Sequence, residues 1–217
     1  MHVRDLGLME YGECLQLQYD ARDSVQLGND DQVFVVEHPL VATLGRRGEP
    51  SDVFDPTIPV FHIERGGKAT LHGPGQLVVY PIVHLGEGNR DVRAWVRHLE
   101  AFLIDMLAHF GIEAETNVEY PGVWTSKTGK KIASIGIAVQ KWVSFHGIAI
   151  NVSLEPKTFE KLDPCGLGAS VMTNMHLEGS DASMADVKAW VLEHAASHFA
   201  KFHPGENNRN FMQSHYH

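Results

Sequence analysis

Two apolar segments in the middle of the chain constrain the fold more than any other feature. Residues 131–140 and 142–152 alternate or run apolar, are rich in β-branched residues, and are separated by a short break at Gln140-Lys141. Such a pair predicts two strands joined as an antiparallel hairpin. Strands this apolar need to be covered, so we expect helices to pack on the sheet that contains them.

Two long segments have the apolar spacing of helices that could supply this cover. The first runs from Asp91 to Phe110, has a continuous apolar stripe, and ends at Gly111. The second runs from Asp181 to Phe202, with candidate N-caps at Ser180, Asp181 and Ser183. Both are predicted to be core-facing helices.

Shorter apolar runs predict further strands at Val33–Glu37, Val60–Ile63, Gln76–Pro81 and residues 122–125. Strands and helices do not alternate as repeated βαβ units. The expected fold class is therefore α+β, with a mixed β-sheet flanked by helices. We expect one domain over residues 1–203 and a polar C-terminal tail over residues 204–217.

Composition excludes several kinds of partner. Among 217 residues, 18 are Lys or Arg and 27 are Asp or Glu, which gives a net charge of −9. The whole molecule should not attract nucleic acid or an anionic membrane non-specifically. The chain shows no signal peptide and no 18-residue apolar run, and its two cysteines cannot form a disulfide framework. We expect a cytoplasmic protein that is a monomer.

The segment Arg65–Gln76 is unusually rich in glycine for a connection between two strands. It holds four Gly, one Pro, one Arg, one Lys and one His. Glycine lets backbone approach a ligand closely, so a loop with Arg65 and His72 is a candidate binder of an anionic or carbonyl-bearing group. The segment matches neither a Walker A loop nor GxGxxG. The alternative is a wide hairpin without a ligand.

Cys165 lies between Pro164 and Gly166, on a predicted sharp turn that would present its sulfur as a nucleophile. The alternative is a small buried residue, which is the interpretation that Cys14 favours. A thiol of ordinary pKa is mostly protonated at neutral pH, so a catalytic cysteine needs a neighbouring cation or base. The candidates in this chain are Lys130, Lys131, Lys141, His72 and His146.

Of these candidates, Lys131 opens an apolar strand, where an inward amine could exchange a proton with a thiol. A solvated strand end is the alternative. His146 is expected to be a satisfied core histidine. His203, His215 and His217 show no compact ligand spacing, so no metal site is expected.

Several motifs together resemble the octanoyltransferase family of lipoate biosynthesis, which is related to the lipoate and biotin protein ligases. The resemblance covers roughly residues 10 to 200. The motifs that carry it are Glu37-His38-Pro39, residues 43–48, the segment 65–82 with HGPGQ, GVWT at 122–125, GKKIASIGIAV at 129–139, FHGIAINV at 145–152 and DPCGL at 163–167.

The resemblance implies a fold like the catalytic domain of those ligases and a defined reaction. An octanoyl or lipoyl group would pass from acyl carrier protein to a specific lysine of lipoyl domains, in 2-oxoacid dehydrogenase complexes and in the glycine cleavage H protein. This is the first step of endogenous protein lipoylation. The matching residues imply a thioester on Cys165 with Lys131 as its dyad partner. The acyl group would pass from one thioester to another and then to an amide, and these two steps need neither ATP nor another cofactor.

The resemblance also implies a substrate-binding set, in which glycines would open an apolar slot for the acyl chain. Its members are Arg65, Gly66, Gly67, Lys68, Ala69, Thr70, Leu71, His72, Ser134, Ile135, Gly136, Gly147, Ile148 and Ala149. His72 or backbone N–H groups are candidates to stabilise the oxyanion. Leu71 and Asn174 depart from the family pattern, and these two differences are expected to affect the shape of the acyl pocket.

Three alternatives remain open at this stage. An ATP-dependent lipoate-protein ligase shares the fold, although it does not require the cysteine of the PCG turn. A non-enzymatic acyl-carrier binding protein would need neither Lys131 nor Cys165. A thiol hydrolase would need a Cys-His-Asn arrangement that the spacing does not indicate.

A basic patch that binds an acidic carrier protein would come from Arg46, Arg47, Lys68, Lys127 and Lys130.

Overall fold

A computed structural model describes residues 1–86, 88, 90–163 and 168–202. Cys165 and the predicted tail therefore lie outside the described residues, as do His203, His215 and His217. No helix in the described part of the chain is both long enough and apolar enough to cross a membrane.

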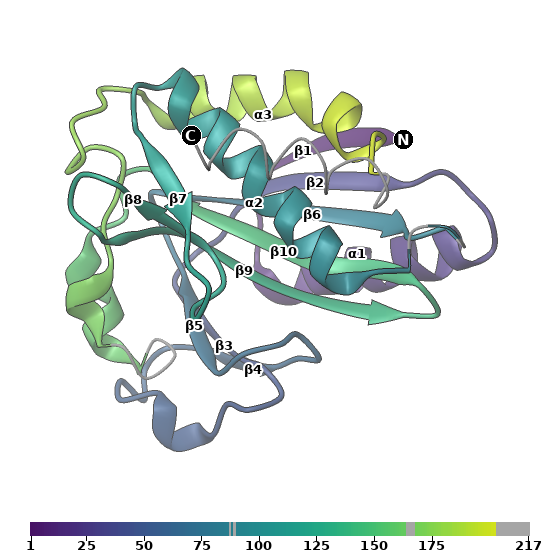
Figure 1. The fold of residues 1–217 in the computed structure, drawn as a ribbon. Helices are drawn as coiled ribbons and strands as arrows, with labels where there is room; N and C mark the ends of the chain where they lie inside the picture. The colour runs from purple at the N-terminus through teal and green to yellow at the C-terminus, as the bar shows by residue number, and fades with distance from the viewer. Residues whose placement is uncertain (87, 89, 164–167, 203–217) are drawn as a thin grey trace.

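The main sheet has seven strands in the order β1-β2-β6-β10-β9-β8-β7 (Figure 1). Its strands are β1 His2–Leu8, β2 Gln32–Glu37, β6 Gln76–His84, β10 Val143–Asn151, β9 Lys131–Gln140, β8 Val123–Thr125 and β7 Ala114–Thr116. Only β1 and β2 pair in parallel. The sheet is therefore mixed, which confirms the predicted fold class.

A second, smaller sheet lies beside the main one, in the order β4-β3-β5. Its strands are β3 Val41–Leu44, β4 Val60–His62 and β5 Ala69–His72. Short 3-10 helices η1, η3 and η4 cover Pro50–Asp52, Pro156–Lys161 and Ala169–Val171. Strand β5 lies inside the glycine-rich segment that the sequence presented as a loop.

Helices cover both faces of the main sheet (Figure 1). Helices α2 Val92–His109 and α3 Met184–Phe199 pack on one face, where Val33 and Val35 of β2 join their core. Helix α1 Tyr11–Gln26 packs on the other face, against Phe34 and Val36 of the same strand. The alternation along β2 explains why its apolar run is continuous: both faces are buried.

The predicted central hairpin is confirmed, with its turn one residue later than expected. Lys141 and Trp142 connect β9 to β10, with φ values of 47° and 63°. Positive φ at both central residues is what a two-residue type I′ turn requires, but such turns usually contain Asn or Gly. The turn thus gives no residue signal in the sequence.

The two long helices are also confirmed, and Ser183 is the N-cap of α3. Helix α1 was not predicted, because its stripe is interrupted by polar residues; one of them, Gln18, is fully buried. Cys14 of the same helix is 0% exposed within the apolar core, which confirms its structural assignment.

Candidate functional site

A cavity of about 470 Å³ lies where β9, β10 and β5 meet the loop of Arg65–Gly67 and the start of α2. Ligand pockets of small molecules usually have volumes in this range and a largely apolar lining. The apolar side chains of the wall are Ile63, Val78, Val92, Val96, Pro121, Ile135, Ile137, Ile148 and Ala149. The cavity can therefore bury an apolar chain beside a small set of polar groups.

The predicted substrate-binding residues line this cavity, with three exceptions: Lys68, Ala69 and Leu71. Successive side chains of a strand point to opposite faces, so Thr70 and His72 of β5 face the cavity while Ala69 and Leu71 face the core. Lys68 instead lies 3.9 Å from carboxylate oxygens of Asp52 and Asp163. The sequence predicted that the whole segment 65–72 binds substrate, but only alternate residues of β5 face the cavity.

Lys131 begins β9 and lines the cavity, where its side chain is only 7% exposed. Its stem passes close to Gly122, and Nζ lies 5.8 Å from the centroid of the Trp124 ring. Its carbonyl accepts a hydrogen bond from Thr173 N–H at 3.0 Å, in a parallel bridge with Met172. The alternative of a solvated strand end is therefore wrong for Lys131.

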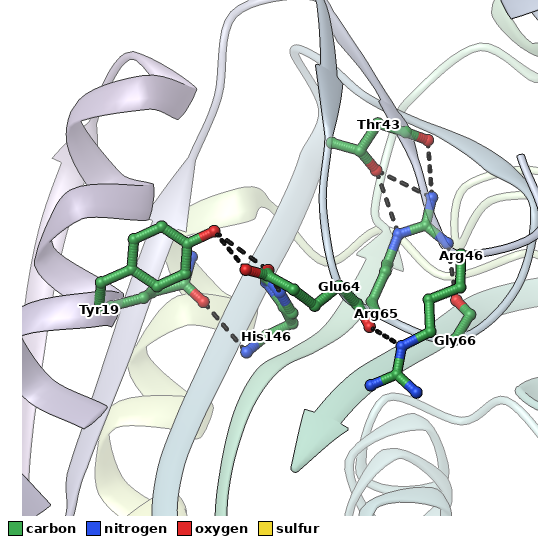
Figure 2. A network of polar contacts seen from close by, with 8 residues as sticks. Tyr19, Thr43, Arg46, Glu64, Arg65, Gly66 and His146 are labelled. Carbon is green, nitrogen blue, oxygen red and sulfur yellow. Dashed lines mark hydrogen bonds and ion pairs between the residues drawn. The ribbon is translucent and has the colours of Figure 1, made fainter. Parts of the chain in front are cut away.

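Arg65 holds the loop that forms one wall of the cavity (Figure 2). Its Nη2 donates to the carbonyl of Thr43 at 2.7 Å and to the hydroxyl of Thr43 at 2.9 Å, and its Nη1 donates to the carbonyl of Gly66 at 2.9 Å. Arg46 N–H and Arg47 N–H bond back to the carbonyls of Arg65 and Gly67. These contacts fix the loop against β3.

His72 belongs to a directional hydrogen-bond chain. The carbonyl of Thr173 can only accept, so the amide of Asn151 donates to it from Nδ2. The Oδ1 of Asn151 is then free to accept a hydrogen bond from Gln76 Nε2. Gln76 Oε1 then accepts from His72 Nδ1 at 2.7 Å. Burial and the nearby His38 lower the pKa of His72 to about 3. The ring is neutral, and its Nε2 presents a lone pair.

This tautomer changes the expectation for His72. An imidazole that carries its proton on Nδ1 can only accept at Nε2, so His72 cannot donate to an oxyanion. Backbone N–H groups remain as candidates for that role.

His146 is buried, as predicted, but it is not a satisfied core histidine. Its φ is 57° within β10, which is uncommon for a residue other than glycine and is associated with functional sites. Nε2 lies 3.4 Å from Glu64, whose carboxylate accepts from Tyr19 Oη (Figure 2). Nδ1 is buried without a hydrogen-bond partner among the described residues. Burial lowers the pKa of His146 to about 4, although Glu64 opposes the shift.

The sequence predicted that glycines open the acyl slot, and this explanation is wrong for two of them. Gly136 is packed under the side chain of Arg65, and Gly147 is packed against the backbone of β6. They permit close contacts within the protein and do not widen the cavity. Leu71 and Asn174, which depart from the family pattern, do not line the cavity.

The sequence reasoning did not identify several cavity residues. Tyr11 stacks on His72 with ring centroids 5.9 Å apart, and Tyr80 bonds to His38 Nε2 at 3.0 Å. Val92 and Val96 were assigned to a core stripe, but they face the cavity at the start of α2. The Glu37-His38-Pro39 motif was the one signal in the sequence for this aromatic cluster.

Of the residues proposed for a basic patch, Arg47 is exposed and lines the cavity. Arg46 is exposed beside it and donates from Nε to the carbonyl of Glu64. Lys127 and Lys130 are exposed on the connection between β8 and β9. Cationic groups thus lie at the rim of the cavity and on a neighbouring turn.

Comparison with known proteins identifies the family. Residues 10–196 match the model of the lipoyl protein ligase A/B catalytic domain. An octanoyltransferase of Syntrophotalea carbinolica is 41% identical over 199 residues, which cover 91% of this chain and 93% of that protein. One from Syntrophobacter fumaroxidans is 42% identical over 200 residues, covering 88% and 86%.

Solved structures agree in fold. A lipoate-protein ligase A bound with ATP has a TM-score of 0.75 at 17% identity, covering 92% of this chain and 86% of that chain. The chain therefore belongs to the lipoyl protein ligase A/B catalytic domain family, and with its octanoyltransferase relatives it is an acyltransferase that transfers octanoyl groups in protein lipoylation.

Proposed function

We propose that this acyltransferase takes its octanoyl group from acyl carrier protein and transfers it through a thioester on Cys165 to a lysine of lipoyl domains. The proposed acceptors are the lipoyl domains of 2-oxoacid dehydrogenase complexes and the glycine cleavage H protein. A solved ligase of the same fold, from Thermoplasma acidophilum, is described together with its E2 lipoyl domain, which makes such an acceptor reasonable here.

The observation that carries the proposal is the position of Lys131. It is a buried lysine in the wall of an apolar cavity, and the Met172–Thr173 segment pairs with its backbone. That segment follows closely after Cys165 in the chain. On the other side of the predicted turn, Asp163 N–H bonds to the carbonyl of Asp52 at 2.7 Å. The residue before the turn is therefore bonded to Asp52, and the segment after it is bonded to Lys131, which lines the cavity.

The proposed chemistry has two balanced steps. Cys165 Sγ attacks the carrier thioester, the bond from the acyl carbon to the carrier sulfur breaks, and the proton of Cys165 passes through Lys131 to the leaving thiolate. The acceptor amine then attacks the acyl-enzyme, the bond from the acyl carbon to Sγ breaks, and Lys131 returns the amine's proton to Sγ. The amide product makes the second step downhill without ATP.

The test is the intact mass of the protein after mixing with octanoyl acyl carrier protein. We expect the wild type to gain one octanoyl group and to lose it when a lipoyl domain is added and becomes acylated. The Cys165→Ala protein should gain nothing, and Lys131→Ala should acylate at least a hundredfold more slowly because its general acid–base group is lost. Lys130→Ala is the matched control, since its exposed neighbouring side chain should be dispensable.

Two outcomes would contradict the proposal. An adduct that survives Cys165→Ala would exclude Cys165 as the nucleophile. Acylation of a lipoyl domain from free octanoate and ATP, without an adduct from the carrier, would instead favour the ATP-dependent ligase.

A further inference from the structure

The outer edge of β9 is incompletely paired where it borders the cavity. Strand β8 pairs with β9 no further than Val123 opposite Ala133. Further along the same edge, Gly66 N–H donates to the carbonyl of Ile137 at 3.0 Å. Between these two points lies Ile135, which lines the cavity. Figure 1 shows β8 alongside only the first part of β9.

The backbone groups of Ile135 point to this open edge. In an antiparallel pair, alternate residues direct both N–H and C=O to the same neighbour. Val152 N–H bonds to the carbonyl of Gly75, the residue just before β6, so Ile148, four residues earlier in β10, also directs its groups to β6. Ile135 is opposite Ile148 and therefore directs its own groups away from β10, as Ile137 does toward Gly66.

These two groups have no partner within the described part of the chain. No backbone or side-chain hydrogen bond joins the N–H or the C=O of Ile135 to a described residue. Pro121, which would continue β8 opposite Ile135, has no N–H to donate. The cavity wall thus presents one donor and one acceptor from the same residue.

An octanoyl chain alone cannot use this position, because a chain of methylenes would cover both groups and leave them unpaired. A secondary amide can use it, since its carbonyl accepts from Ile135 N–H and an amide N–H donates to Ile135 C=O. From this geometry we infer that Ile135 is an amide-binding site for the pantetheine arm of the acyl donor. This inference rests on the proposed function, because pantetheine is the group that carries acyl thioesters on carrier proteins.

The size of the gap favours a pantetheine arm over a peptide strand. A peptide strand would need the positions of Ala133, Ile135 and Ile137 in succession, but Ala133 is paired with Val123 and the carbonyl of Ile137 already accepts from Gly66 N–H. Between these two bonded points of the described strand, Ile135 is the one residue whose backbone groups point outward. Pantetheine has two secondary amides separated by two methylenes, so it offers one carbonyl and one N–H close together. Arg47 is exposed and lines the same cavity, so its cation is available to the phosphate of a phosphopantetheine arm on a carrier protein.

The test measures hydrogen exchange of the Ile135 amide by NMR in Cys165→Ala protein labelled with ¹⁵N-isoleucine, which should bind the donor without reacting. Octanoyl-pantetheine at saturation should slow the exchange of Ile135 at least tenfold. The matched probe is an octanoyl thioester of an alkyl thiol of the same length as pantetheine, which has neither amide carbonyls nor amide N–H groups, and it should give no such protection. Ile148, whose amide faces β6, is the internal control and should not change.

A kinetic arm on the wild-type protein separates this site from the proposed function. Acyl-enzyme formation should be about tenfold slower from the alkyl analogue than from octanoyl-pantetheine, as expected for a lost hydrogen bond. Equal rates with equal protection would overturn the amide site while leaving the thioester mechanism intact. Protection by an acceptor-lysine peptide, and not by octanoyl-pantetheine, would also overturn the inference, because the edge would then bind the acceptor. Protection without any acyl-enzyme would support the site and contradict the role of Cys165.

Discussion

The cavity and the interface between α2 and α3 each contain two histidines, buried or half-buried, but they use the rings differently. In the helix interface, His98 Nε2 donates to the carbonyl of His198 at 3.0 Å and His198 Nε2 donates to the carbonyl of His98 at 3.1 Å. The rings stack with centroids 4.2 Å apart. In the cavity, His72 presents a lone pair and His146 has an unpartnered buried Nδ1 among the described residues.

The comparison shows that a lowered pKa does not by itself mark a functional site. Burial lowers the pKa of His98 to about 4, as it does for His146. What distinguishes the cavity is a set of polar groups with no hydrogen-bond partner among the described residues: Nε2 of His72, the backbone groups of Ile135 and Nδ1 of His146. In the helix interface, each histidine ring donates a hydrogen bond to the main chain of the other helix.

The largest effect is expected for Gly147→Ala, in the floor of the cavity. A Cβ there would overlap the carbonyl oxygen of Val79 and lie 2.9 Å from Pro81 Cδ and 3.1 Å from Tyr80 Cα. Backbone of a central strand cannot move aside cheaply, so the free energy of unfolding should fall by about 3 kcal/mol or more. Denaturant unfolding measures it. A loss below about 1 kcal/mol would show that β6 and β10 are less rigidly packed than described.

Gly136→Ala should separate stability from activity, although Gly136 is the cross-strand partner of Gly147. Its Cβ would lie 2.8 Å from Arg65 Cδ, which belongs to a side chain and can shift. We expect a stability loss of about 1 kcal/mol, but a loss of about tenfold in kcat/KM as Arg65 leaves Thr43 and the loop moves.

Thr43→Val provides a matched control for this interpretation, because it removes the hydroxyl that accepts from Arg65 and leaves Gly136 unchanged. It should lower kcat/KM in the same direction. Full activity in both variants would mean that Arg65 does not control the loop.

Apolar periodicity was sufficient to predict the central strands and two of the helices, because burial on one or both faces determines those residues. Helix α1 was missed because its buried face includes Gln18, whose side chain accepts from His146 N–H. Cavity residues were predicted where they belong to a residue motif, as with Arg65 and Lys131. The open position at Ile135 could not be predicted, since it consists of main-chain atoms that depend on how far β8 extends.

The last effect is expected in the pH dependence of stability, and it tests the helix interface without touching the cavity. The pKa of His98 in the folded protein, about 4, lies below the unfolded value of about 6.5. Unfolded chains therefore bind the proton first, so this contribution to stability is present above pH 6.5 and is lost as the pH falls toward 4. Between pH 7.5 and 5.5, His98 should account for a loss of about 1.4 kcal/mol in unfolding free energy. His98→Phe should reduce the pH-dependent loss by that amount and leave kcat/KM unchanged, whereas His109→Phe, at an exposed position of α2, should alter neither. If His98→Phe instead lowered kcat/KM at constant stability, the helix interface would be coupled to the cavity and the contrast between the two regions would fail.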